Sequence, residues 1–555
     1  MNAMPRPPRL DRAGLIVTAT GVVSASAVSH ALDERSDLAF AFGFLLYLAL
    51  ITFAASRQPF RHAYLVAFAA FAATYIGLDH IQDGVGLPVL VYVTAAALAT
   101  AATPRDYRPL TVGAFALWTP AIRFFGPHPF DAYFPLSVTI AAILALFTLV
   151  AILIARDPVT PDERIRRIGL GMLAVACVAT VADRHAVVAS PGIVAPDDLL
   201  VVVAVGLFPL LAVVRLRPAL RDALATGLTL GIYALVGIIF IVGQSYNVDT
   251  VTAQHQATQL FLKGENPYRS VDVVASLRQF GLDPALGTHL EDGSQIHSFN
   301  YPALAFLVPA PFMALGVTDI RLIYLGEVLL LVLVLLRPIR VPWRPLVAAV
   351  IVGNTIIARQ NVLAGVDPSY ALFLALAFMF IRRRTFSPIL IGLAVASRQP
   401  AWFFVPFYVL AIWRRDGRNE ALRRTGILVG TAILPNLPFF LDAPGAFVAG
   451  VTAPMLLALE PYGVGLVRFG VDGVLPLWPR AVYGLLSAVA LAGLLTLLWR
   501  RWRDLPNAAV VFPSLVLWFS WRSAQNYFGF AGVFSLIGDE TMLADDEPVP
   551  LDQMG

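Results

Sequence analysis

The chain has 555 residues, of which 58% are hydrophobic and 14% are charged. Soluble domains are about 45–50% apolar and about 25% charged, so this composition excludes a soluble globule and predicts a polytopic membrane protein. The formal net charge is +4, and arginine supplies nearly all of the positive charge. On so apolar a background this excess favours positive-inside topology, and we expect no nucleic-acid partner.

We expect an all-α fold, a polytopic transmembrane helical bundle with about 17 to 19 apolar segments, because about 20 apolar residues form a helix that crosses a bilayer. Residues 1–222 are expected to form an amino-terminal transmembrane module of unknown role. Its one cysteine, Cys177, lies in an apolar run and is expected to be a small core residue. Candidate spans before the polar loop at 244–301 lie near 13–31, 38–56, 62–78, 87–103, 109–125, 134–155, 168–183, 199–214 and 223–243.

Arginines occupy every second connection between these spans, which the positive-inside rule makes cytoplasmic. They lie at positions 57 and 61, 105 and 108, 156 and 164–167, and 215–221. Aspartates occupy the other connections. This alternation predicts that the polar loop 244–301 is extracytoplasmic.

The loop 244–301 is the most polar part of the chain, and it places an acid, Asp249, within six residues of the apolar run that ends at Gly243. The next segment, 250–262, is predicted to be a helix ended by Gly264. Segment 271–280 is predicted to be a second helix that lies flat in the membrane interface with its apolar face down. That face carries Val273, Val274, Leu277 and Phe280.

Beyond the loop, apolar runs continue near 302–316, 321–336, 345–358, 368–381, 386–397, 400–413, 425–441, 475–499, 507–521 and 526–538. Arginine clusters at 382–384, 414–424 and 500–503 mark cytoplasmic turns. The cluster at 337–344 would also be cytoplasmic, yet two crossings cannot connect an outer loop to an inner cluster. Either 302–316 or 321–336 is therefore re-entrant or interfacial, or this cluster breaks the rule.

The same counting places Arg359, Arg398 and Arg522 on the outer face, where the charge bias disfavours arginine. A guanidinium group binds phosphate oxygens in a bidentate manner, so these residues are candidates to bind a lipid phosphate. The alternative for each is an arginine at a helix end whose charge reaches the interface.

The loop resembles the first extracytoplasmic loop of the GT-C glycosyltransferases. The resemblance rests on Asp249, the run Gly264-Glu265-Asn266-Pro267-Tyr268, and Asn300-Tyr301-Pro302-Ala303-Leu304 at the start of the next apolar run. It is closest to the polyprenol-phosphate-sugar-dependent mannosyltransferases, although Ala303 stands where a second proline is usual. Arg359-Gln360-Asn361 and Ser397-Arg398-Gln399-Pro400 extend it, so that it covers 223–538.

The resemblance implies a membrane glycosyltransferase that moves mannose or a related sugar from a polyprenyl-phosphate donor to a lipid or glycan acceptor hydroxyl. Transfer would occur with inversion at the extracytoplasmic face of the plasma membrane, in envelope glycan or glycolipid assembly. Asp249 matches the catalytic base. The candidates to stabilise the leaving phosphate are, in order, Lys263, Arg398, Arg359 and Arg522. The other residues expected to bind substrate are Asn266, Tyr268, Tyr301 and Asn361.

Two other classes stay open, namely a polytopic transporter or lipid flippase with Arg359, Arg398 and Glu327 along its path, and a non-catalytic lipid-binding relative. Transporters usually show related halves, whereas this chain concentrates its polar residues in one loop. Glu327 is more simply a helix partner of Arg321.

No metal site is expected from ligand spacing, although a divalent ion stays open because some relatives use one. The residues of ligand type in the loop are His255, His289, His297, Glu291 and Asp292. The acidic tail 539–555 is expected to be disordered and to contain no site.

Overall fold

The computed structural model describes residues 216–336, 368–463, 466–471, 476–500 and 508–524, without residues 244 and 247, together with a few single residues elsewhere. These residues are mostly helical, and the strands among them are the two-residue parallel pair β1 (Tyr462–Gly463) and β2 (Arg522–Ser523). The all-α class is therefore confirmed for this part of the chain. Almost all of module 1–222 lies outside the described residues, as do Cys177, Arg359, Asn361 and the tail 539–555.

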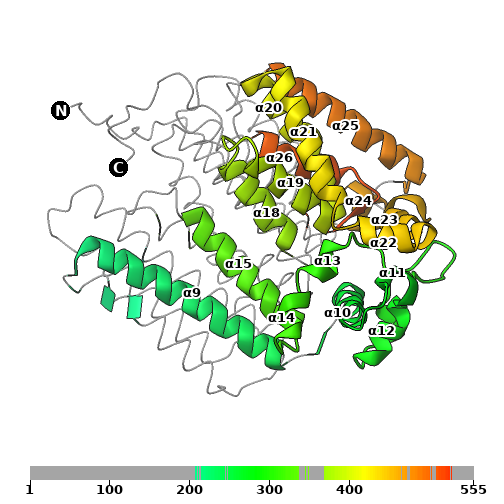
Figure 1. Ribbon diagram of the computed structural model, residues 1–555, viewed down its shortest axis with the longest axis horizontal. Helices are drawn as coiled ribbons and strands as arrows, with labels where there is room; N and C mark the ends of the chain where they lie inside the picture. Colours follow the sequence, from blue (N-terminus) through cyan, green and yellow to red (C-terminus); the bar gives the residue numbers. More distant parts are fainter. Residues whose placement is uncertain are drawn as a thin grey trace.

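The polar loop forms a small helical cap at one end of the long helices. The elements from the preceding span to the next one are α9 (Pro218–Gly243), α10 (Asp249–Leu262), α11 (Pro267–Ser270), α12 (Val273–Gln279), η2 (Pro284–Leu286), α13 (Leu304–Leu307), α14 (Ala310–Ala314) and α15 (Ile320–Leu336). In Figure 1, α10, α11 and α12 lie at the right-hand end of α9 and α15. We call residues 245–303 without residue 247 the cap.

The second half of the described chain contributes both long helices and short ones that meet the cap. Its elements are α18 (Ser369–Met379), α19 (Phe386–Ser397), η5 (Gln399–Phe404), α20 (Val405–Asp416), α21 (Arg418–Ile433), α22 (Leu437–Asp442), α23 (Pro444–Leu456), α24 (Leu466–Val471), α25 (Arg480–Arg500) and α26 (Ala508–Trp518). Helices α22 and α23 lie beside α11 at the same end of the molecule as the cap (Figure 1).

Two of the described helices, α9 and α25, are long and apolar enough to cross a membrane. The segment 302–316 contains α13 and α14, which are four and five residues long and together form the short apolar stretch Leu304–Ala314. Even taken as one helix, this stretch rises only about 17 Å along its axis, far less than the bilayer core of about 30 Å. Pro309 and Pro311 lack the N–H that a continuous helix needs here. Of the two runs between the cap and residue 337, only 321–336 forms a long helix, the 17-residue α15.

The short helix expected to lie flat in the interface, 271–280, packs its apolar face against protein instead. It forms α12, and Val273, Val274 and Leu277 are buried. Ser276 Oγ donates to Thr252 Oγ1 of α10 at 3.0 Å. The prediction of a helix was right, but α10 covers the surface that was assigned to lipid.

A buried ion pair fixes the cap to the long helices at the end of α9. Arg321 of α15 is 2% exposed and binds both carboxylate oxygens of Asp319, with Nη2 at 2.7 Å from Oδ2 and Nε at 3.1 Å from Oδ1. Its guanidinium also donates to the carbonyl oxygens of Ile241 and Ser245, at 2.8 and 3.2 Å. Carbonyls at a helix end have no partner within the helix, so Arg321 closes the end of α9. The expected pairing of Arg321 with Glu327 is not what the structure shows, since Glu327 accepts a bond from Ser369 Oγ at 2.7 Å.

His255 of α10 lies buried beside this ion pair. Its Nδ1 is 2.7 Å from the Tyr246 hydroxyl, and its Nε2 is 3.1 Å from Gln259 Nε2. The Phe280 ring packs against it, with centroids 4.7 Å apart. Burial lowers the pKa of His255 from 6.5 to about 4, with the nearby Asp319 charge opposing the change. His255 is therefore neutral at physiological pH.

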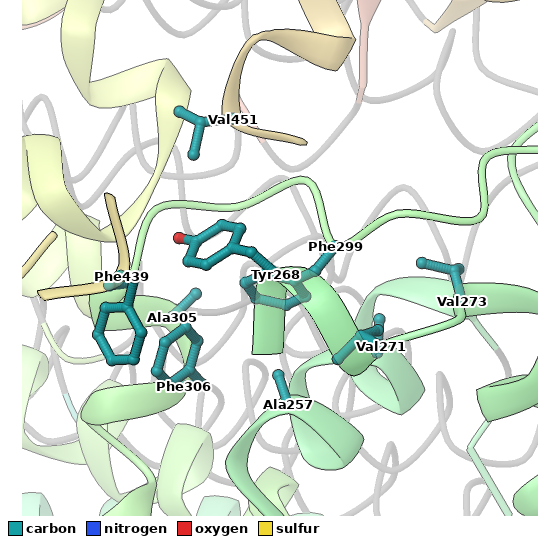
Figure 2. Packing of buried hydrophobic residues seen from close by; sticks show 11 residues of the cluster. Ala257, Tyr268, Val271, Val273, Phe299, Ala305, Phe306, Phe439 and Val451 are labelled. Atoms are coloured by element: carbon teal, nitrogen blue, oxygen red, sulfur yellow. The ribbon is translucent and has the colours of Figure 1, made fainter. Parts of the chain in front are cut away.

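Aromatic side chains from the cap and from the following helices form one core around Tyr268. Figure 2 shows Tyr268 at the centre, with Phe439 and Phe306 on one side and Val271 on the other. Tyr268 is 4% exposed and packs edge-on against Phe299 and Phe306, with ring centroids 5.5 and 6.1 Å apart. Such pairs add about 0.5–1.5 kcal/mol each beyond the area that they bury. This core joins α11 to the segment that leads into α13.

We predict that acidification destabilises the protein through His255. Its folded-state pKa of about 4 lies below the ordinary 6.5, so between these values the unfolded chain binds a proton that the folded chain does not. Stability is therefore complete above about pH 6.5 and falls by up to about 3 kcal/mol towards pH 4. Thermal unfolding in detergent should show a shallower pH slope for His255→Gln. Equal slopes for the wild type and His255→Gln would contradict the assignment.

We also predict that Gly450→Ala destabilises the contact between α23 and the cap. A Cβ at Gly450 would lie 2.2 Å from the Phe299 carbonyl oxygen, so the backbone must move, at a cost of about 1–3 kcal/mol. Gly445→Ala in the same helix is the control, because a Cβ there meets nothing within 4 Å. Thermal unfolding temperatures should fall for the first variant only, and equal temperatures would show that α23 does not press on Phe299.

Candidate functional site

The proposed base, Asp249, is the first residue of α10 and is half-buried. Its Oδ2 accepts two bonds from Thr288, one from the backbone N–H at 2.9 Å and one from Oγ1 at 2.6 Å. Its Oδ1 lies 3.4 Å from Thr250 Oγ1. The carboxylate is thus held against the loop and does not extend into open solvent.

Tyr301 connects Asp249 to a buried cation. The Tyr301 hydroxyl lies 2.9 Å from Thr250 Oγ1, next to Asp249 in the chain. On the other side, the Arg398 guanidinium carbon lies 4.6 Å from the centre of the Tyr301 ring, which is a cation–π distance. Burial raises the pKa of the Tyr301 phenol, an effect that the Arg398 charge opposes and the Asp249 charge increases. Tyr301 is therefore a neutral hydroxyl that lies near both a carboxylate and a guanidinium.

Arg398 reaches this position because helix α19 ends there. It is the C-cap of α19, in extended backbone conformation, and is 5% exposed. The next residue, Gln399, begins η5 and donates from Nε2 to the carbonyl oxygens of Asn300 and Val451, at 2.7 and 3.2 Å. The Ser397–Pro400 and Asn300–Leu304 motifs, which are distant in sequence, therefore meet at Tyr301.

Asn266 and Tyr268 hold the site together through contacts with protein. The Tyr268 hydroxyl donates to the Tyr301 carbonyl oxygen at 2.7 Å. The Asn266 side chain caps α11 by accepting from the Tyr268 N–H at 3.0 Å, and it donates to Asp442 Oδ2 of α22 at 2.7 Å. Both residues thus fix the backbone around Tyr301, and their contact with substrate stays a prediction.

Lys263 does not share a site with Asp249. It is the exposed C-cap of α10, and the 14 residues of this helix place it roughly 21 Å from the first turn. A cation at that distance does not stabilise charge on a group bound at Asp249. Arg398 therefore replaces Lys263 as the first candidate to bind the leaving phosphate.

Arg522 lies beside the site and contacts protein. It is in β2, with its guanidinium carbon 5.4 Å from the centre of the Tyr462 ring and its Nη1 3.3 Å from the Glu460 carbonyl oxygen. The Glu460 N–H donates to the carbonyl of His289, the residue after Thr288, at 3.1 Å. Arg522 is therefore linked to Asp249 through the loop. Arg359 and Asn361 lie outside the described residues.

Sequence reasoning missed Thr250, Thr288 and Gln399 as members of this site. Gln399 stands inside the quoted motif Ser397–Pro400, and Thr250 follows Asp249 directly, so both could have been found as neighbours. Thr288 is 39 residues from Asp249 and belongs to no motif. Only the folded loop brings it to the carboxylate.

The three histidines of the cap each have a separate partner. Those partners are Tyr246 for His255, Gln295 for His289 and Asp272 for His297. Across the ranges that the structure describes, no group of three or more His, Cys, Asp or Glu side chains is placed to hold a metal ion. The described geometry therefore offers a carboxylate, a phenol and a guanidinium for chemistry.

Comparison with known proteins adds no relative. No family model, curated protein or solved structure matches this chain. The assignment of a function therefore depends on the residues themselves.

Proposed function

We propose that this protein is a membrane glycosyltransferase of the GT-C type. It moves mannose or a related sugar from a polyprenyl-phosphate donor to a hydroxyl of a lipid or glycan acceptor, with inversion, on the extracytoplasmic side. The observation that carries this proposal is that Tyr301 contacts both Thr250, the residue after Asp249, and Arg398. A base and a phosphate-binding cation near one another are what transfer from a lipid phosphate requires.

The acceptor hydroxyl attacks the anomeric carbon while Asp249 removes its proton. A new carbon–oxygen bond forms on the face opposite the phosphate, and the bond from the anomeric carbon to the phosphate oxygen breaks. The electron pair of that bond stays on the polyprenyl phosphate. Arg398 stabilises the resulting charge through its planar set of N–H donors.

The placement of arginines supports a polytopic bundle whose cap faces outward. Helix α21 begins at Arg418 and rises about 24 Å before it ends at Ile433, near α22 and the cap. The α20–α21 turn at its other end is rich in arginine, with residues 414, 415, 418, 423 and 424. The positive-inside rule assigns this turn to the cytoplasm. One long helix, α15, lies between the cap and the arginine cluster at 337–344. A single crossing would put the cap and this cluster on opposite sides of the membrane, which agrees with the same orientation.

Exposed apolar side chains support contact with lipid along these helices. On α25, Leu485, Val489 and Leu497 are 64%, 60% and 41% exposed. Large apolar side chains exposed along a whole helix are costly in water. In a bilayer the same side chains face acyl chains, so the proposal explains why they are not covered by protein.

Replacing Asp249 by Asn should abolish transfer and leave the fold intact, because the amide cannot accept the proton and is nearly the same size. Purified protein in nanodiscs is incubated with radiolabelled polyprenyl-phosphate mannose, or the corresponding lipid-linked pentose, and a membrane lipid extract. Asp292→Asn is the matched control, since Asp292 is an exposed aspartate of the same loop, and it should retain activity. Wild-type turnover by Asp249→Asn would rule out this base, and absence of transfer by the wild type from every donor would overturn the proposed function.

Replacing Arg398 by Gln should lower kcat/KM for the polyprenyl-phosphate donor by about 100-fold, because a stabilising cation is lost from the leaving group. Arg398→Lys retains the charge but lacks the planar set of donors, so its kcat/KM should lie between those of the wild type and Arg398→Gln. Size-exclusion profiles and circular dichroism spectra check that the variants fold. Equal kcat/KM for wild type and Gln variant would place the phosphate elsewhere.

A further inference from the structure

The two oxygens of the Asp249 carboxylate have different surroundings. Oδ2 accepts both the N–H and the hydroxyl of Thr288, at 2.9 and 2.6 Å. The contact recorded for Oδ1 within the described part of the chain is the long one to Thr250 Oγ1, at 3.4 Å. Hydrogen bonds to an ionised oxygen are about twice as strong as neutral ones, so the Thr288 pair fixes the rotation of the carboxylate.

Thr288 itself is held by a hairpin formed by residues 288–296. Its carbonyl accepts from the Ile296 N–H at 3.0 Å, and the Leu290 N–H donates to the Ser294 carbonyl at 2.8 Å. The turn between them contains Gly293 with φ of 81°, a conformation that side chains disfavour. The hairpin gives Thr288 a defined place opposite the start of α10.

A segment from the second half of the chain supports the outer side of this hairpin. The Glu291 N–H donates to the Ala458 carbonyl at 2.7 Å, and the Glu460 N–H donates to the His289 carbonyl at 3.1 Å. The Trp521 indole N–H in turn donates to the Leu459 carbonyl at 2.5 Å. Thr288 is thus a rigid donor and not part of a loosely held turn.

We propose that Thr288 is a positioning residue that holds Oδ2 of Asp249, so that Oδ1 is the oxygen that receives the proton of the acceptor hydroxyl. This inference rests on the proposed function. Thr288 touches neither substrate, and it acts through Asp249. The acceptor then approaches from the side of Thr250 and Tyr301, where Oδ1 lies.

The physical benefit is orientation. A carboxylate that rotates freely presents its basic oxygen in the reactive direction for only part of the time, and a misplacement of 1 Å can cost about 100-fold in rate. Two donors on one oxygen remove that freedom before substrate arrives. A neutral hydroxyl achieves this without a cation that would compete with Arg398 for the phosphate.

The kinetic test compares Thr288→Val with Thr288→Ser. Valine keeps the branched shape that suits the hairpin but removes the hydroxyl, whereas serine keeps the hydroxyl. The valine variant should lose about 10- to 100-fold in kcat with KM for polyprenyl-phosphate mannose within about twofold of wild type, since the donor site is untouched. The serine variant should stay within about threefold of wild type. Thr452→Val is the matched control, because that hydroxyl donates to Val448 of its own helix, and it should be fully active.

Two kinetic results would overturn the inference. One is an unchanged kcat in Thr288→Val. The other is an equal loss in the valine and serine variants, which would mean that the hydroxyl is not the cause. A merely structural role would lower the thermal unfolding temperature and the fraction of active protein, and kcat per active molecule would not change.

A structural arm separates this inference from the proposed function. If the wild type transfers no sugar, the function fails, yet the orientation of Asp249 can still be observed by cryo-electron microscopy of the wild type and of Thr288→Val. In the valine variant only the Thr288 N–H still donates to Oδ2, so the inference predicts that the carboxylate occupies more than one rotamer. The same rotamer in both proteins would overturn it whatever the activity.

Discussion

The hydrogen bond from the Tyr268 hydroxyl to the Tyr301 carbonyl is the contact on which the rest of the site depends. It fixes the backbone of the chain where the cap re-enters the helices, in a core of aromatic rings that excludes water. With that carbonyl held, the Tyr301 ring lies beneath Arg398 and its hydroxyl reaches Thr250. A buried hydroxyl that lost its acceptor would cost about 1–3 kcal/mol, so fold stability and site geometry share this bond.

A second constraint lies near the start of α10. Arg321 closes the end of α9 and pairs with Asp319, both at the boundary between a long apolar helix and the cap. Breaking a buried pair by removing one partner costs about 3–5 kcal/mol. Helix α10 is therefore anchored at its start by contacts to two long helices, and at its end by the aromatic core. Asp249, the first residue of α10, lies at the former end.

Hydrophobic patterning located some of the helices, and α19 begins and ends where the apolar run 386–397 does. It missed α23, Pro444–Leu456, and it placed the end of α21 and the whole of α22 in one run, 425–441. Asp249 stood out by its place in the polar loop, whereas the segments around Tyr301 and Arg398 stood out through the resemblance to the GT-C glycosyltransferases, and their part in sugar transfer stays a proposal. Three matters depended on tertiary structure. Apolar residues of α12 face protein and not lipid, since a period of 3.6 residues shows that a face is buried but not what covers it. Lys263 is distant from Asp249 because a straight helix intervenes, and Thr288 is near it because a hairpin folds back.

The pairing of residues 289–291 with 458–460 has a consequence for biogenesis. A ribosome delivers the cap long before it delivers α23, β1 and the Trp521 indole that supports Leu459. Until those later segments are made, the hairpin that holds Thr288 against the Asp249 carboxylate lacks the contacts that support it. Under the proposed function, partly translocated intermediates would carry every motif of the loop and yet transfer sugar more slowly, so that assembly of the chain delays full activity.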